Sequence, residues 1–262
     1  MNAADELLIS QKGPVRWITF NRPEARNALT WNMYERLLEA CSAVNADRSA
    51  RAVVFTGAGG KAFVAGTDIA QFRAFKTEKD ALDYEAKGNA VMSAIESIRV
   101  PTIAAIAGPC TGAGAAIAAC CDIRIGSPTA RYGLPIARTL GNCLSMANYA
   151  RLSALLGVAR LKDVIMRARL MESGEMLSSG LLSEITTDEA SLLPRAQALA
   201  EEMTELAPLT LWATKEALRR LRERLVPEGG DKDLILACYM SADFHEGVEA
   251  FLSKRKPQWK GE

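Results

Sequence analysis

The sequence has few of the groups that bind metals or nucleic acids. It contains a single histidine, His245, and none of its six cysteines forms a C-x-x-C pair, so no zinc-ligand pattern is present. Lysine and arginine number 32 against 31 aspartates and glutamates, a formal net charge of +1 in 262 residues. Nucleic-acid binding needs a concentrated basic footprint, which this balance does not supply. An anionic small molecule, which needs only two or three cations, is not excluded.

Long apolar runs are also scarce. Residues 100–121 are the one uncharged stretch of bilayer length, 22 residues. This stretch is rich in alanine, and two prolines and three glycines interrupt it, so a strand, a glycine turn and a buried helix explain it better than a membrane span. The scattered cysteines are typical of small buried side chains in a reducing compartment. We therefore predict a cytoplasmic protein with no membrane partner.

Apolar periodicity predicts strands that alternate with helices up to residue 126, followed by a helical C-terminal region. This order indicates an α/β fold with right-handed crossovers. The expected strands are 7–11, 15–20, 52–56, 102–107 and 123–126, and the expected helices are 30–44, 81–98, 112–121, 145–156, 160–166, 193–204 and 208–225.

Two segments of small residues, 63–69 and 108–116, stand out as a candidate site. Glycines at a strand-to-helix turn let a ligand approach the backbone, and a helix N-terminus offers free N–H groups. Together the segments would form an oxyanion hole. The alternative is that the glycines only permit tight turns and helix packing. Spacing alone favours the alternative, because neither a G-x-G-x-x-G nor a G-K-[ST] motif is present.

Five segments, taken in order, resemble the enoyl-CoA hydratase/isomerase, or crotonase, superfamily: 20–29 (FNRPEARNAL), 61–69 (KAFVAGTDI), 101–108 (PTIAAIAG) with the glycine turn, 121–124 (CDIR) and 246–255 (EGVEAFLSKR). The resemblance implies a crotonase-like spiral of ββα units over residues 1–195 and a C-terminal helical trimerisation region over 196–262. It also implies an acyl-CoA substrate, no cofactor beyond the CoA of that substrate, and a homotrimer or a dimer of trimers.

The resemblance assigns roles to individual residues. The backbone N–H groups of Thr67 and Ala113 match those that hold the thioester oxygen. Arg26 and Lys254 are also interpretable as ordinary solvated cations, and Asp68 as a helix cap. The residues that match the CoA-binding segments of the family are Arg26, Ala28, Ala65, Asp68, Ile69 and Lys254.

Two departures from the family pattern bear on the reaction. Ala116 and Ile136 occupy the positions of the two glutamates that position and activate water in the family's hydratases. General acid–base catalysis contributes about 10²–10⁴-fold, whereas each oxyanion-hole donor contributes about 10²–10³-fold. We therefore predict an enzyme that stabilises a thioester enolate and hydrates poorly. Decarboxylation, C–C cleavage and non-catalytic thioester binding remain alternatives.

The segment after Ile136 is polar where the family places its acyl pocket. Arg138 is predicted to grip a substrate carboxylate, with a salt bridge at a trimer interface as the alternative of equal weight. Asn142 joins Ala116 and Ile136 as an acyl-pocket residue, with helix capping as its alternative. For Cys143 we favour simple burial. The basic run at 219–224 alternates with glutamates, so we expect a solvated helix face and no nucleic-acid partner.

Overall fold

The computed structural model describes residues 6–227 and 230–262. The strands are β1 (Leu7–Lys12), β2 (Val15–Phe20), β3 (Ala52–Gly57), β4 (Val64–Ala65), β5 (Thr102–Ile106), β6 (Pro109–Thr111), β7 (Ile123–Gly126), β8 (Arg131–Gly133), β9 (Leu170–Glu172) and β10 (Glu184–Ile185). The α-helices are α1 (Trp31–Ala46), α2 (Glu78–Glu96), α3 (Ala113–Cys120), α4 (Ile136–Thr139), α5 (Met146–Met166), α6 (Ser173–Ser178), α7 (Leu192–Thr204), α8 (Pro208–Glu223), α9 (Lys232–Tyr239) and α10 (Ala242–Leu252).

The strands form two sheets, and the chain alternates between them. The larger sheet has the order β1-β2-β3-β5-β7-β10 and the smaller the order β4-β6-β8-β9. Each of β3, β5 and β7 is followed along the chain by a strand of the smaller sheet, β4, β6 and β8 respectively. The chain therefore winds as a spiral in which each turn adds one parallel strand to each sheet. This confirms the predicted crotonase-like α/β fold.

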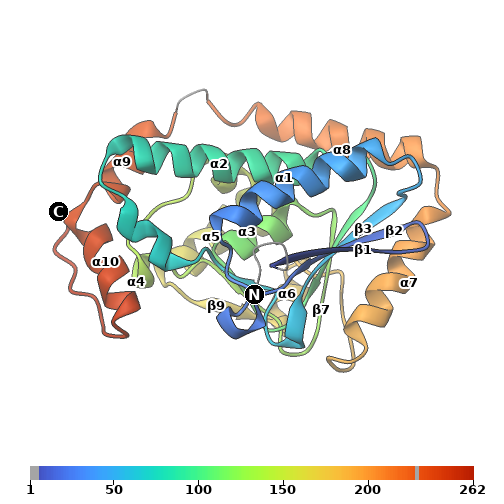
Figure 1. Cartoon of the computed structure of the whole chain (residues 1–262), viewed down its shortest axis with the longest axis horizontal. Coiled ribbons are helices and arrows are strands. Elements are labelled where there is room, and N and C mark those ends of the chain that lie inside the picture. The colour runs from blue at the N-terminus through green and yellow to red at the C-terminus, as the bar shows by residue number, and fades with distance from the viewer. Residues whose placement is uncertain (1–5, 228–229) are drawn as a thin grey trace.

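The central strands of the larger sheet are buried on both faces. In β3, Val53 and Phe55 belong to the main core beneath α1 and α2, whereas Ala52 and Val54 face the opposite way, towards α7. Such continuous burial produces the unbroken apolar run of this strand. Figure 1 shows α7 on one side of the sheet, with α1, α2 and α3 on the other.

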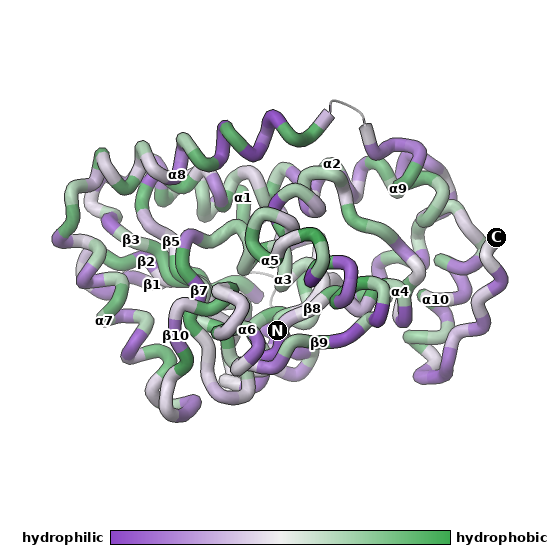
Figure 2. Tube along the Cα trace, turned by 180° about the vertical axis from the view of Figure 1, so that it is seen from behind, coloured by the Kyte–Doolittle hydropathy of each residue, from purple (hydrophilic) through white to green (hydrophobic). Residues whose placement is uncertain are grey.

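The C-terminal helices pack against the rest of the chain. The predicted boundary at residues 195/196 falls inside α7, whose Ala196 and Ala200 are buried against the larger sheet, and the division into two regions stays a prediction. The helices α9 and α10 form a third apolar cluster with the 3₁₀ segment η4 (Ile69–Ala74) and with α2. Only α8 has no fully buried residue among the longer helices of the described chain. Figure 2 shows it running along the edge of the molecule with hydrophobic and hydrophilic residues intermixed.

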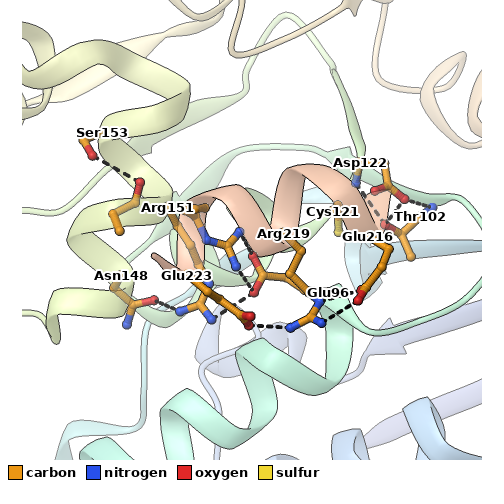
Figure 3. A network of polar contacts seen from close by, with 12 residues as sticks. Glu96, Thr102, Cys121, Asp122, Asn148, Arg151, Ser153, Glu216, Arg219 and Glu223 are labelled. Atoms are coloured by element: carbon orange, nitrogen blue, oxygen red, sulfur yellow. Dashed lines mark hydrogen bonds and ion pairs between the residues drawn. The ribbon is translucent and has the colours of Figure 1, made fainter. Parts of the chain in front are cut away.

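Ion pairs hold α8 to the body of the protein (Figure 3). Glu96 of α2 accepts hydrogen bonds from Arg222 of α8, at 2.7 Å to one oxygen, and from Arg151 of α5, at 2.9 Å. Lys215 donates to Asp122 at 2.6 Å. The expected solvated face is therefore wrong for Arg222, which points inward with 18% of its side chain exposed.

The uncharged stretch at residues 100–121 forms β5, β6 and α3, as the glycine-turn interpretation predicts. No helix of the described chain is both long and apolar enough to cross a membrane.

Candidate active site

Two loops lie side by side where the smaller sheet ends. β4 and β6 are parallel neighbours, with Ala65 opposite Thr111. Because parallel strands end at the same edge of a sheet, the chain leaves both strands together, at residues 66–67 and at residues 112–113. α3 begins at Ala113, immediately after the second loop. The two segments singled out in the sequence therefore form one site.

Close packing explains the glycines of the second loop. A Cβ atom on Gly114 would lie 2.1 Å from the Val64 carbonyl oxygen, and one on Gly112 would lie 3.3 Å from the Gly66 Cα atom. Gly112 also has a φ of 54°, which disfavours any side chain. These glycines therefore have a packing role. The same packing brings the first turn of α3 against the loop that carries Thr67.

Both predicted oxyanion donors have free N–H groups. Leu29 donates to the Gly66 carbonyl at 2.9 Å, and Asp68 donates to the Leu29 carbonyl at 2.8 Å. These two hydrogen bonds do not involve the N–H of Thr67. Ala113 is the first residue of α3, so its N–H has no acceptor within the helix and lies at the positive end of the helix dipole. Within residues 6–227 and 230–262, neither N–H donates a hydrogen bond to another part of the chain.

A cavity of about 160 Å³ is lined by both Thr67 and Ala113. Its walls come from the two loops, from α2, from the segment that follows β8, and from α9 and α10. The structure brings most of the predicted site together here. The predicted site residues that line the cavity are Ala65, Thr67, Ile69, Ala113, Ala116, Ile136 and Asn142.

The CoA-binding candidates of the first loop lie beside this cavity. Ala65 donates to the Arg26 carbonyl at 3.1 Å, so the segment with Arg26 and Ala28 runs next to the oxyanion loop. The Asp68 carboxylate accepts from Arg22 at 3.0 Å and from the Ala70 N–H at 3.2 Å, at the start of η4. Its role as a helix cap is confirmed. CoA contacts of Arg26, Ala28 and Asp68 stay predictions.

Two predicted cationic contacts lie outside the cavity. Arg138 is exposed on α4 and does not line the cavity, although the neighbouring Ile136 and Thr139 do. Its predicted grip on a substrate carboxylate has no support in the geometry of the single chain. Lys254 is exposed beyond the end of α10, three residues after Phe251, which does line the cavity. Its contact with CoA stays a prediction.

Asn142 does not cap a helix. The cap of α5 is Ser145, whose hydroxyl accepts from the Asn148 N–H at 3.4 Å. Asn142 Nδ2 instead donates to the Tyr239 hydroxyl at 3.1 Å. The capping alternative for Asn142 is therefore wrong. Its Oδ1 is buried without a hydrogen-bond partner in the described residues.

Glu85 of α2, which no motif in the sequence singles out, is the one carboxylate among the described residues that line the cavity. Its Oε1 accepts a 2.6 Å hydrogen bond from the Tyr239 hydroxyl. Burial raises the pKa of Glu85 from 4.5 to about 7, an effect that the Tyr239 hydrogen bond partly offsets and the negative charge of Asp231 reinforces. The missed signal is its spacing from Ala81 and Met92, which places a carboxylate on the apolar face of the helix.

Two phenols hold the side chain of Thr67. The hydroxyl of Tyr34 lies 2.8 Å, and that of Tyr84 3.2 Å, from Thr67 Oγ1. Burial raises the pKa of Tyr34 to about 12, so this phenol stays protonated at neutral pH. These bonds fix the side chain of a residue that lines the cavity.

A model of the enoyl-CoA hydratase/isomerase family matches residues 10–262. The chain belongs to this family. A Rhizobium meliloti protein named "probable enoyl-CoA hydratase" is 34% identical over 259 residues, 98% of each chain. The short-chain-enoyl-CoA hydratase of Clostridium acetobutylicum is 31% identical over 260 residues, 96% of each chain. A solved structure of methylmalonyl-CoA decarboxylase in complex with 2-nitronate-propionyl-CoA is similar with a TM-score of 0.88 and 26% identity, over 98% of this chain and 99% of that chain.

Membership of the family makes the chain an acyl-CoA-processing enzyme. Ala116 of α3 and Ile136 of α4 line the cavity with apolar side chains. That they replace the two glutamates of the family's hydratases stays a prediction. The carboxyl group of Glu85 in this cavity comes from α2.

Proposed function

We propose that this enzyme stabilises the enolate of an acyl-CoA thioester with the backbone N–H groups of Thr67 and Ala113. The observation that supports the proposal is that Thr67 and Ala113 line one cavity and that, among the described residues, the N–H of neither donates to the backbone. Donors aimed at a developing oxyanion contribute about 10²–10³-fold each. CoA enters as part of the substrate, and the proposed chemistry needs no further cofactor.

Hydration of enoyl-CoA is a poor fit to this cavity. Adding water requires one group to activate the water and another to deliver a proton to carbon. Ala116 and Ile136 supply neither, and each acid–base role is worth about 10²–10⁴-fold. We therefore propose that hydratase activity is orders of magnitude below that of a typical enzyme.

Decarboxylation is the second candidate, favoured by the likeness to the solved methylmalonyl-CoA decarboxylase. Loss of CO₂ leaves an electron pair on the α-carbon, so the enolate forms without a base that removes a proton. The same N–H groups then accept the charge. C–C cleavage of a β-keto thioester has the same requirement.

A panel of thioesters separates these functions. Calorimetry with acetyl-CoA tests binding, and mass spectrometry follows products from crotonyl-CoA, methylmalonyl-CoA and a β-keto thioester. We expect micromolar binding, turnover of a substrate that loses carbon, and negligible hydration. Hydration at about 1–10³ s⁻¹, the common enzymic range, would contradict the proposal. Binding without any turnover would instead support a non-catalytic thioester binder.

We also propose that the chain assembles as a homotrimer or a dimer of trimers, with α8 in the interface. Its support is a set of exposed apolar side chains at the end of α8 and just beyond it, where Leu218, Leu221 and Leu225 are each more than half exposed. Light scattering coupled to size-exclusion chromatography is expected to show three or six chains. A monomer at micromolar concentration would contradict this assembly.

A further inference from the structure

Glu85 is a carboxyl group in the cavity proposed to hold the thioester. It lines the same cavity as Thr67 and Ala113 but comes from α2. Gly88, three residues further along the helix, also lines the cavity, and a Cβ atom there would meet nothing within 4 Å. This part of α2 therefore borders open space.

No structural role explains why the carboxyl group of Glu85 is buried. It is 9% exposed, and in the described residues it forms no ion pair and has Tyr239 as its hydrogen-bond donor. A buried carboxyl without a cation is costly, and an apolar side chain in its place is often more stabilising. Among the described residues, the titratable groups around Glu85 are all acids. They are Tyr34 of α1, Tyr84 of α2, Cys143 in the segment before α5, Tyr149 of α5, Asp231 at the N-cap of α9, and Tyr239 of α9.

A short chain of hydrogen bonds orients the carboxyl group. Asn142 Nδ2 donates to the Tyr239 oxygen, and the Tyr239 hydroxyl donates to Glu85 Oε1. Tyr239 is 1% exposed, so its hydroxyl has a fixed position between the two. The structure gives a hydrogen bond to Oε1 alone, which leaves Oε2 for a substrate.

From this arrangement we propose that Glu85 is the catalytic acid–base residue of this enzyme, exchanging a proton with the α-carbon of the bound thioester. The proposal rests on the proposed enolate chemistry. It makes α2, rather than α3 or α4, the source of the proton-transfer group. Tyr239 and Asn142 are positioning residues, because they act through the carboxyl group.

The proposed step is the transfer of a proton from Glu85 to the α-carbon. The O–H bond of the neutral Glu85 carboxyl breaks, and the enolate electron pair forms a new C–H bond at the α-carbon. The thioester carbonyl re-forms, and Glu85 is left as a carboxylate that accepts from Tyr239. Solvent returns the proton. In reverse, the carboxylate removes an α-proton, and the thioester oxygen takes up the charge at the Thr67 and Ala113 N–H groups.

Exchange of α-protons for deuterium tests this step directly. Propionyl-CoA, which has α-protons and no group to lose, is incubated with the enzyme in D₂O and followed by mass spectrometry. We expect the wild type to catalyse exchange and Glu85→Gln to lower its rate at least 100-fold, within the usual worth of an acid–base group. Glutamine keeps an oxygen that accepts from Tyr239, so propionyl-CoA is expected to bind within threefold of the wild type.

Glu78→Gln is the matched control, because Glu78 is an exposed glutamate at the start of the same helix. Its exchange rate is expected to equal that of the wild type. The inference is overturned if Glu85→Gln exchanges within threefold of the wild type, or if the wild type binds propionyl-CoA and exchanges nothing. Failure of every thioester to bind would instead overturn the proposed function.

Tyr239→Phe tests the positioning role. The Tyr239 hydrogen bond lowers the pKa of Glu85, so its loss is expected to move the midpoint of the exchange-versus-pH profile upward from about pH 7. A purely structural tyrosine would lower the rate and leave the midpoint in place, and that result would contradict the role.

Discussion

The Tyr239 hydroxyl on α9 donates a 2.6 Å hydrogen bond to Glu85 Oε1 on α2. The two residues lie 154 positions apart in the sequence, yet both line the cavity that Thr67 and Ala113 also line. The C-terminal helices therefore complete the pocket of their own chain, through the aromatic cluster that joins Phe72, Tyr84, Tyr239 and Phe244.

The raised pKa of Glu85 predicts a pH-dependent loss of stability. The folded chain keeps a proton that the unfolded chain releases between pH 4.5 and about 7, so the wild-type free energy of unfolding falls as pH rises through this window and levels off above it. Glu85→Gln removes this term. Its stability relative to the wild type is expected to increase by on the order of 3 kcal/mol from pH 4.5 to 8, measured by urea unfolding.

The exposed control Glu78→Gln is expected to show no such trend. A Glu85→Gln difference that stays constant across these pH values would show that Glu85 titrates normally in the folded protein.

Two glycines of the site are predicted to respond in opposite ways to alanine. At Gly114 the added methyl group would lie 2.1 Å from the Val64 carbonyl oxygen, so α3 must move off β4. We expect Gly114→Ala to lower the free energy of unfolding by at least about 1–3 kcal/mol. Gly88→Ala meets open space in a helix and is expected to be neutral or to stabilise by up to about 1 kcal/mol. Equal effects in thermal unfolding would contradict this account of the glycine turn.

The buried charge network of Figure 3 predicts a large effect at Glu96. Glu96→Gln removes the only carboxylate that pairs with both Arg151 and Arg222 among the described residues. Unpaired buried charge typically costs about 3–5 kcal/mol. Glu172→Gln is the matched control, since its pair with Arg131 is exposed and is worth about 0–1 kcal/mol. Denaturant unfolding in which the two variants are equally stable would rule out a structural role for the network.

Local signals in the sequence predicted much of the fold. Thr30 caps α1 by accepting from the Met33 N–H, as its place before an apolar-periodic run indicates. The sequence predicts two helices that are separated between residues 156 and 160. The structure has a break in α5 there, at Gly157, whose φ of 70° and ψ of 152° are not helical. Signals of this kind depend on neighbours along the chain and need no tertiary information.

Such local signals do not predict the smaller sheet or the polar end of the pocket. β4 has two residues and β8 has three, too few to show a period of two, and their pairing comes from the spiral as a whole. Arg138 has the right chemistry at the right distance along the chain, but the turn of α4 exposes it. The sequence does not single out Glu85, because the rest of α2 is mainly polar. Its partner Tyr239 lies on α9, which only the folded chain brings near.

The carbonyl stretching frequency of a bound thioester tests the central claim most directly. Infrared difference spectra with ¹³C-carbonyl propionyl-CoA report hydrogen bonding to that oxygen. We predict a frequency below that in water for the wild type. Ala113→Pro deletes one N–H at the first helical position, where proline is well tolerated, and is expected to reverse part of the shift, while Ala113→Ser retains it. An unshifted carbonyl in the wild type, or the same shift in Ala113→Pro, would contradict an oxyanion hole at Thr67 and Ala113.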